Sequence, residues 1–346
     1  MKRVLASVTM AVTALLALTA CNPPMPPSVA AQIAEQTYTC IDGQAKVAFT
    51  PAMDSLAAEW LMSMETACTD TVMSFTPSES AGADIILSTY PVTACKPIST
   101  VPVAIEAADI AFSLSVSTTL YLSPKTAAGI FNGEITNWSD PAIAEENPET
   151  QMPDQPIILR DQVDDLAFRS LKNFTEHYGA AINASFEQLP LTASNVQPLA
   201  DGEIALLPHS VSLELALSTA SFIQAPVDGV DQLANADSMS IMSGGTQWVP
   251  VQEGDNVSVL LDYSIAPQVL DGMDTASPPY QLIYPVFLNI CNDTLLSRAV
   301  SFFFLRLDSQ GSLGVSVFTQ LPESTRVVSL VAVKRGLPVP TATPTE

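Results

Sequence analysis

The sequence predicts an α/β protein. Short apolar runs typical of strands alternate along the chain with segments whose apolar residues recur at helical spacing. Of the 346 residues, 47% are hydrophobic and 14% are charged, which is enough apolar material for about two packed domains. No internal repeat and no shift in composition marks a linker inside residues 35–335. We therefore expect domains between which the chain crosses more than once.

The first elements are a strand, a helix and three further strands. Residues 46–49 form a short apolar strand, and Leu56, Trp60 and Met64 recur every four residues, which predicts a helix with one apolar stripe. Strands follow at residues 71–75, 84–88 and 101–105.

Helix signals are clearer in the later part of the chain. Ser123 and Pro124 are typical of an N-cap and a first helical residue, and Gly133 is placed to end that helix. A strand at residues 157–159 precedes a helix over residues 164–178 with a regular apolar stripe. A last long helix is predicted over residues 297–311, with Ser297 as its cap.

The two ends of the chain differ from the body. Residues 1–20 begin with Lys2 and Arg3 and continue as an apolar run, which is typical of a cleaved secretory signal. The segment that ends in Cys21 resembles the lipobox of bacterial lipoproteins, which implies a diacylated Cys21, although an ordinary cleavage site with a chance cysteine is the alternative. Residues 21–34 then form a linker, and the Pro/Thr-rich residues 336–346 a disordered tail.

Charge and composition exclude several function classes. With 13 basic against 36 acidic residues, the net charge of -23 argues against nucleic acid or an anionic membrane surface as the main partner. His177 and His209 form no metal-ligand spacing with cysteine, and no phosphate-cradling glycine loop or nucleophile elbow is present. We therefore expect no metal, no cofactor and no catalysed reaction.

Four cysteines remain once Cys21 is set aside. Cys40, Cys68, Cys95 and Cys291 are even in number, which in an oxidising compartment allows two disulfides in three possible connectivities. Cys40 and Cys68 each precede a predicted strand, which favours a 40–68 bond and leaves 95 with 291. Four free buried thiols are the alternative.

Residues 122–148 carry the most specific pattern in the chain. The run from Leu122 through IFNGEITNWSDPAI to Asn147-Pro148 resembles the phosphate-binding proteins of ABC transporters. The resemblance continues at residues 156–160, which end in Arg160, and more thinly at residues 48–52, 83–91, 284–286 and 297–311.

This resemblance implies a type II periplasmic-binding fold, in which two α/β lobes are joined by a two-strand hinge and enclose a ligand cleft. Lobe 1 would hold residues 35–104 and 285–335, and lobe 2 residues 105–284. It further implies an extracytoplasmic, lipid-anchored monomer that captures phosphate or a related small ligand and delivers it to an ABC permease.

The residues implied for ligand binding depart from the family pattern. Arg160 corresponds to the anion-binding arginine, and Thr50, Ser88 and Thr89 lie on the opposite lip, with Thr89 in place of the family's aspartate. The hydroxyl and glycine donors after the arginine are replaced by Asp164 and Asp165.

The positions of Asp164 and Asp165 allow two interpretations. If they face the cleft, a unit charge pair at 4 Å and an effective dielectric of about 20 repels an anion by roughly 4 kcal/mol, or about three decades of affinity. If they are first-turn acids turned to solvent, Arg160 pairs with one of them. The first reading favours a cationic or neutral ligand, or a sensor or interaction module that binds no phosphate.

Overall fold

The computed structural model describes residues 40–49, 53–77, 82–90, 92–116, 119–227, 230–270, 278–315 and 317–337, together with Val29, Ile33, Glu35 and Tyr38. Every element discussed below lies in one compact unit, residues 39–338. The predicted signal segment, Cys21 and the end of the predicted tail, from residue 338 onward, lie outside the described residues. In the described part of the chain, no helix has the length and apolar character needed to cross a membrane.

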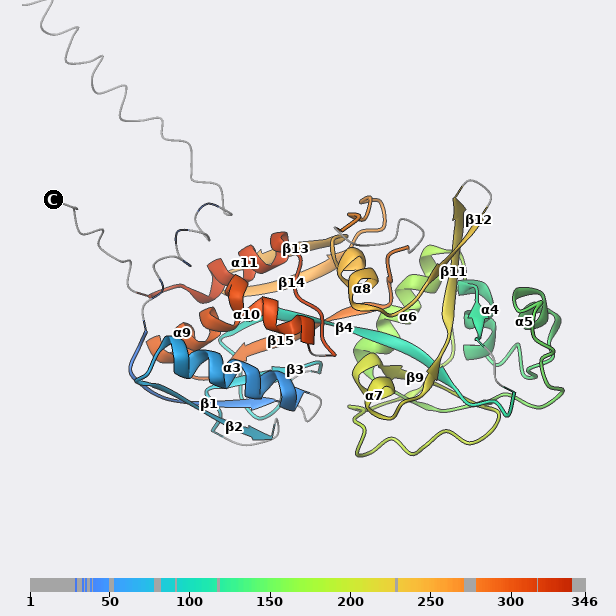
Figure 1. The fold of residues 1–346 in the computed structure, drawn as a ribbon, viewed down its shortest axis with the longest axis horizontal. Helices are drawn as coiled ribbons and strands as arrows, with labels where there is room; N and C mark the ends of the chain where they lie inside the picture. Colours follow the sequence, from blue (N-terminus) through green and yellow to red (C-terminus); the bar gives the residue numbers. More distant parts are fainter. Residues whose placement is uncertain are drawn as a thin grey trace, which may run out of the picture. The chain divides into compact units, whose positions relative to one another are not determined.

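The largest sheet contains eight strands in the order β2-β1-β3-β15-β4-β9-β6, and β10 pairs with β4. β1 pairs in parallel with β2 and β3, whereas β15 is antiparallel to β3 and β4. The predicted α/β class is therefore confirmed (Figure 1). The bounds of these strands are β1 Gly43–Phe49, β2 Thr71–Pro77, β3 Ile85–Ser88, β4 Ser99–Phe112, β6 Ile158–Leu159, β9 Glu203–Pro208, β10 Ser218–Thr219 and β15 Ile283–Ile290.

Strand β4 is 14 residues long and belongs to both lobes. Its first part pairs with β15, with Ser99 opposite Ile290 and Ala107 opposite Ile283. Its last part, residues 108–112, pairs instead with β9. The antiparallel pair β4 and β15 therefore forms the two-strand connection between a lobe around β1, β2 and β3 and a lobe around β9 and β6 (Figure 1).

Smaller sheets complete the structure. β5 (Tyr121–Leu122), β11 (Ser221–Val227) and β12 (Val230–Ala234) form one of them, β7 (Gln162–Val163) and β8 (Glu187–Gln188) another, and β13 (Trp248–Glu253) and β14 (Asn256–Leu261) a hairpin. The helices are α3 Asp54–Ala67, α4 Pro124–Phe131, α5 Pro141–Glu146, α6 Asp165–His177, α7 His209–Glu214, α8 Ser238–Gly245, α9 Leu295–Phe304, α10 Leu307–Gly311 and α11 Glu323–Val333, with the 3-10 turn η2 at Ser312–Val315.

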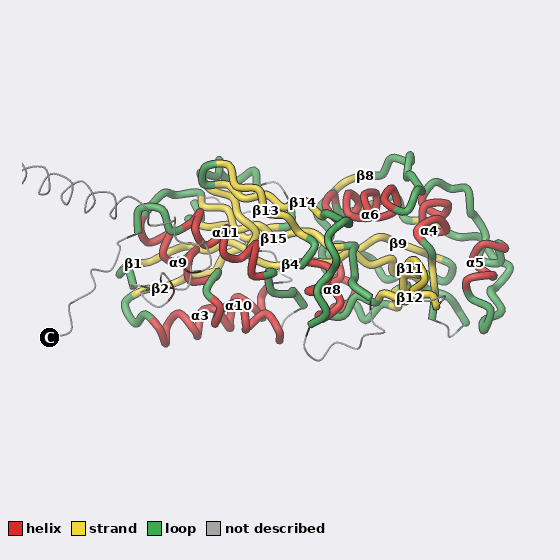
Figure 2. Tube along the Cα trace, turned by 90° about the horizontal axis from the view of Figure 1, so that it is seen from above, coloured by secondary structure: helices red, strands yellow, loops and turns green. Residues whose placement is uncertain are grey.

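The hairpin β13–β14 lies beside β4 (Figure 2). The Ser99 hydroxyl donates to the carbonyl of Asp255 at 2.6 Å, and the Arg298 guanidinium of α9 bonds the Asp255 carboxylate at 3.0 Å. The hairpin falls inside residues 105–284, the range predicted for lobe 2. These contacts nevertheless join it to the first part of β4 and to α9, which belong to lobe 1.

Local signals in residues 122–148 produce the predicted structure. The Ser123 hydroxyl accepts a hydrogen bond from the Thr126 amide, which caps α4, and Pro124 is its first residue. Gly133 follows the helix at φ +70°, a left-handed conformation that glycine adopts without strain. The buried Trp138 donates from its indole nitrogen to the carbonyl of Gly202 at 3.0 Å, which fixes this segment to the second lobe.

The predicted long helix at residues 297–311 is wrong in two respects. Thr294, not Ser297, caps the helix, because its hydroxyl accepts from the Ser297 amide at 3.0 Å. The helix also ends at Phe304, since Arg306 adopts an extended conformation (ψ 151°) before α10 begins. The break brings α10 back toward α3, where Trp60 donates to the carbonyl of Ser309 at 3.0 Å.

Both disulfides have the connectivity that the sequence favoured. Cys40 is bonded to Cys68 and Cys95 to Cys291. The first follows from strand register: Gly43 of β1 lies opposite Thr71 of β2, so the cysteines three residues before each strand also meet.

Candidate functional site

A cleft of about 570 Å³ lies between the two lobes. One wall consists of β3 and the segment that connects it to β4, and the other consists of the start of α6 and the end of β8. Its lining residues are Ile86, Tyr90, Val92, Thr93, Ala94, Asp164, Asp165, Gln188, Leu189 and Pro190.

Strand register explains why the second wall forms. β7 and β8 pair in parallel with Val163 opposite Gln188, and the Leu189 amide bonds the Val163 carbonyl at 3.1 Å. The residues that follow each strand therefore emerge at the same edge, with Asp164 and Asp165 beside Leu189 and Pro190.

On the first wall, β1 and β3 run in parallel, so their carboxyl ends also meet at one edge. Of the residues predicted there, Thr50 lies outside the described residues. Ser88 is fully buried, and its hydroxyl donates to the carbonyl of Tyr90 at 2.8 Å. Thr89 is partly exposed and is not among the lining residues, whereas its neighbour Tyr90 is.

Asp164 is the N-cap of α6 and the more deeply buried acid of the cleft. One carboxylate oxygen accepts from the amides of Leu166 and Ala167 at 3.0 and 3.2 Å, and the residue is 2% exposed. Desolvation by burial raises the pKa of Asp164 to about 6, with a smaller contribution from the nearby charge of Asp165. Among the described residues Asp164 forms no ion pair.

Asp165 begins α6 and has a cationic partner four residues later. The Arg169 Nε donates to its carboxylate at 3.1 Å, and a second Arg169 nitrogen bonds the other oxygen. Both aspartates are among the lining residues of the cleft, at the start of α6, where the sequence alternative also placed them. The part of that alternative in which they turn to solvent and one of them pairs with Arg160 is wrong.

Arg160 bonds a different set of groups. Its guanidinium donates to the carbonyls of Gln197 and Pro198 at 2.8 and 2.9 Å and to the Glu203 carboxylate at 2.8 Å. Burial raises the pKa of Glu203, but hydrogen bonds from Arg160 and the Ala200 amide outweigh this and lower it below its usual value. Arg160 is not among the lining residues.

A second acidic group lies on the strands that cross between the lobes. Burial raises the pKa of Glu106 on β4 to about 7, although Ser210 and His209 lower it in part. The Asp109 carboxylate bonds His209 Nδ1 at 2.8 Å. Tyr284 on β15 lies opposite Glu106 in the strand register, and burial together with the charges of Glu106, Asp164 and Asp109 raises its pKa.

Among the described residues, the cleft presents two carboxylates, apolar side chains, Tyr90, Thr93 and Gln188, and no basic side chain. This arrangement disfavours an anion, because like charges repel, and suits a positive or neutral polar group. No group of three or more His, Cys, Asp or Glu side chains in the described part of the chain is arranged to hold a metal ion.

Sequence reasoning missed most of the lining residues. Tyr90, Val92, Thr93 and Ala94 directly follow a predicted strand, so their position after its carboxyl end was a usable signal. Residues 188–190 gave no such signal, because β8 is only two exposed polar residues long.

Two lobes, a pair of crossing strands and an interlobe cleft together define the type II periplasmic-binding-protein fold. No protein-family model and no curated protein matches the sequence.

Solved structures do match the fold. A high-affinity periplasmic phosphate-binding protein with bound phosphate, PfluDING, is 14% identical, and the match covers 87% of this chain and all of that one at a TM-score of 0.50. An ancestral soluble variant of the human phosphate-binding protein is 13% identical, with 84% and 93% covered at the same TM-score. The chain therefore has the fold of phosphate-binding proteins, as the sequence predicted.

Proposed function

We propose that this protein is an extracytoplasmic solute-binding protein, anchored through a lipid on Cys21, that captures a small ligand between its lobes for an ABC permease. The fold and the interlobe cleft support this role, and the pattern at residues 122–148 supports the kind of transporter. It would bind its ligand without catalysing a reaction. It would also act as a monomer. Lobe 1 would hold residues 35–104, 248–261 and 285–335, and lobe 2 would hold the remainder of residues 105–284.

We further propose that the ligand is a small cationic or neutral solute and not phosphate. The observation that carries this proposal is the position of Asp164 and Asp165 in the cleft wall, while Arg160 is bonded to Glu203. Phosphate, which the sequence resemblance implied, would meet the carboxylate of Asp164, which forms no ion pair among the described residues, and that of Asp165, which Arg169 bonds. It would meet no basic side chain among the described lining residues.

Calorimetric titration tests this proposal. Protein from residue 22 onward, refolded free of bound ligand, is titrated with inorganic phosphate, with the diamine 1,4-diaminobutane and with the quaternary ammonium choline. We expect no heat from millimolar phosphate and measurable binding of a cation. Submicromolar phosphate affinity would refute the ligand class.

Matched variants locate the binding. Asp164→Asn should weaken cation binding at least tenfold, because it removes the one cleft carboxylate that forms no ion pair among the described residues. Asp165→Asn should weaken binding less, because Arg169 already bonds that carboxylate. Glu176→Gln removes a charge from an exposed position on the same helix and should leave affinity unchanged. Failure of every probe to bind would instead favour the sensor or interaction module, for which the acidic cleft is the only specific support.

A further inference from the structure

The wall segment, which we define as Tyr90 together with residues 92–97, lies between β3 and β4 and supplies four of the lining residues. The hydrogen bonds described for this part of the chain lie at its two ends. The Ser88 hydroxyl bonds the carbonyl of Tyr90, and the Ile98 amide bonds the carbonyl of Ile290 at 2.9 Å. Among the described residues 92–97, no backbone or side-chain hydrogen bond to the rest of the chain is present, and the Cys95–Cys291 disulfide is the one covalent attachment.

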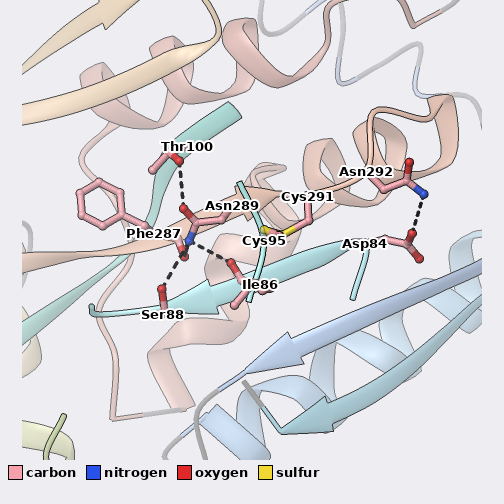
Figure 3. Close-up of a disulfide and its surroundings, with 9 residues drawn as sticks. All are labelled: Asp84, Ile86, Ser88, Cys95, Thr100, Phe287, Asn289, Cys291 and Asn292. Carbon is pink, nitrogen blue, oxygen red and sulfur yellow. Dashed lines mark hydrogen bonds between the residues drawn. A yellow bond between two sulfur atoms is a disulfide. The ribbon is translucent and has the colours of Figure 1, made fainter. Parts of the chain in front are cut away.

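The other end of this disulfide is firmly fixed (Figure 3). The Cys291 amide donates to the carbonyl of Asp84 at 2.9 Å, and the Asn292 side chain donates to the Asp84 carboxylate at 2.9 Å. Two residues earlier, the buried Asn289 side chain donates to the carbonyl of Ile86 at 3.1 Å and so ties β15 to β3. The bond therefore joins a segment with few attachments to a part of the first lobe that is held by several hydrogen bonds.

Apolar packing gives the wall segment limited additional support. Val92, Cys95 and Cys291 pack against a small cluster formed by Ala48, Ala83 and Ile86. Two of these three are alanines, so the apolar area that Val92 covers is small. Thr93 and Ala94 are exposed.

The second disulfide provides an internal comparison. Cys40 and Cys68 precede the amino ends of β1 and β2, whereas the cleft lies at the carboxyl ends of β1 and β3. Neither cysteine is among the lining residues, and both flanking strands are held by a continuous parallel ladder. This bond stabilises the fold without contacting the cleft.

We propose that the Cys95–Cys291 disulfide is a positioning device for ligand binding: it holds the wall segment, Tyr90 and residues 92–97, as a preformed cleft wall. Preorganised walls raise affinity because less conformational entropy is lost when the ligand binds. The effect on affinity rests on the proposed function, whereas the effect on the wall segment does not.

Backbone 15N order parameters of the ligand-free protein test the wall directly. In the wild type, residues 92–97 should have values near those of the strands, about 0.85, and in the double variant Cys95→Ala/Cys291→Ala values below about 0.6. The matched variant Cys40→Ala/Cys68→Ala should leave the wall unchanged. Equal order parameters in all three proteins, or a mobile wall in the wild type, would overturn the proposal.

Titration with 1,4-diaminobutane and with inorganic phosphate supplies the functional test. Whichever probe binds the wild type should bind the 95/291 variant at least tenfold more weakly and the 40/68 variant within twofold. An unchanged affinity in the 95/291 variant would refute the positioning role in binding. If neither probe binds the wild type, choline takes their place in the same comparison. If choline also fails to bind, the proposed ligand class fails, while the order parameters still decide whether the disulfide fixes the wall.

If the Cys95→Ala/Cys291→Ala variant does not fold, the Cys95–Cys291 disulfide is instead opened in the folded wild-type protein. Dithiothreitol reduces the disulfide to two thiols and becomes the cyclic disulfide, and alkylation followed by mass spectrometry identifies the cysteines released. Cys95 and Cys291 are both partly exposed, whereas Cys68 is 2% exposed, so mild reduction should open the 95–291 bond first. The same order parameters and titrations then apply.

Discussion

Replacing Asp164 by asparagine should stabilise the protein at neutral pH. Asparagine is as effective an N-cap as aspartate, so the bonds from the Leu166 and Ala167 amides remain while the buried charge is removed. The pKa of Asp164 rises from 3.8 to about 6 on folding. At about 1.4 kcal/mol per pKa unit, the ionised carboxylate destabilises the folded state by about 3 kcal/mol above pH 7.

The sign of the pH dependence follows from the raised pKa. The folded state binds this proton more tightly than the unfolded state, so the stabilisation by protonation is complete below about pH 4 and is lost as the pH rises through about 6. The free energy of unfolding of Asp164→Asn should therefore exceed that of the wild type by about 3 kcal/mol at pH 8, and the difference should fall to near zero at pH 4.

Guanidinium denaturation at pH 4, 5, 6, 7 and 8 measures this difference. Asp140→Asn is the matched control, because Asp140 caps α5 through the Ala142 amide at 2.9 Å but is partly exposed. It should change stability by less than about 0.5 kcal/mol at every pH. A variant at Asp164 that is no more stable than the wild type at pH 8, or that differs equally at every pH, would refute the reasoning.

Three further outcomes are expected. Arg160→Ala should lower stability by about 1–3 kcal/mol, because it leaves Glu203 without its cation, and it should leave cation binding within twofold in a calorimetric titration. Cys40→Ala/Cys68→Ala should lower the free energy of unfolding by about 3–4 kcal/mol in a denaturant titration, because the bond closes a loop of 28 residues and so restricts the unfolded chain. The pKa of Glu106 is about 7 in the folded protein, well above its unfolded value of 4.5, so the wild type should lose unfolding free energy as the pH rises from 5 to 8. Glu106→Gln should lose less over the same range, and an unchanged pH profile would contradict this.

Local signals in the sequence were sufficient wherever one short segment determines the structure. Ser123, Pro124 and Gly133 specify the ends of α4 through their own backbone preferences. The Cys40–Cys68 pair followed from two strand starts. By contrast, the long helix predicted at residues 297–311 has continuous helical periodicity, and its break before α10 depends on packing against α3.

The site was harder to predict because its chemistry depends on partners far apart in the sequence. Arg160 is bonded to Glu203, 43 residues later, and nothing in the local sequence of either residue indicates this pair. The position of Asp164 in the cleft depends on the pairing of β7 with β8, two strands of two residues each. Resemblance to a family identified the scaffold, and only the fold placed the charges within it.

The energetics of Asp164 bear directly on ligand class. A capping position requires an oxygen acceptor, which serine, threonine or asparagine supplies without a charge. An aspartate that is 2% exposed and carries a raised pKa is a less stable choice for that purpose. A cation bound in the cleft would lower the pKa of this carboxylate and offset the cost of its burial. Under the proposed function, the charge of Asp164 serves binding and its cap serves folding, two roles that Asp164→Asn separates.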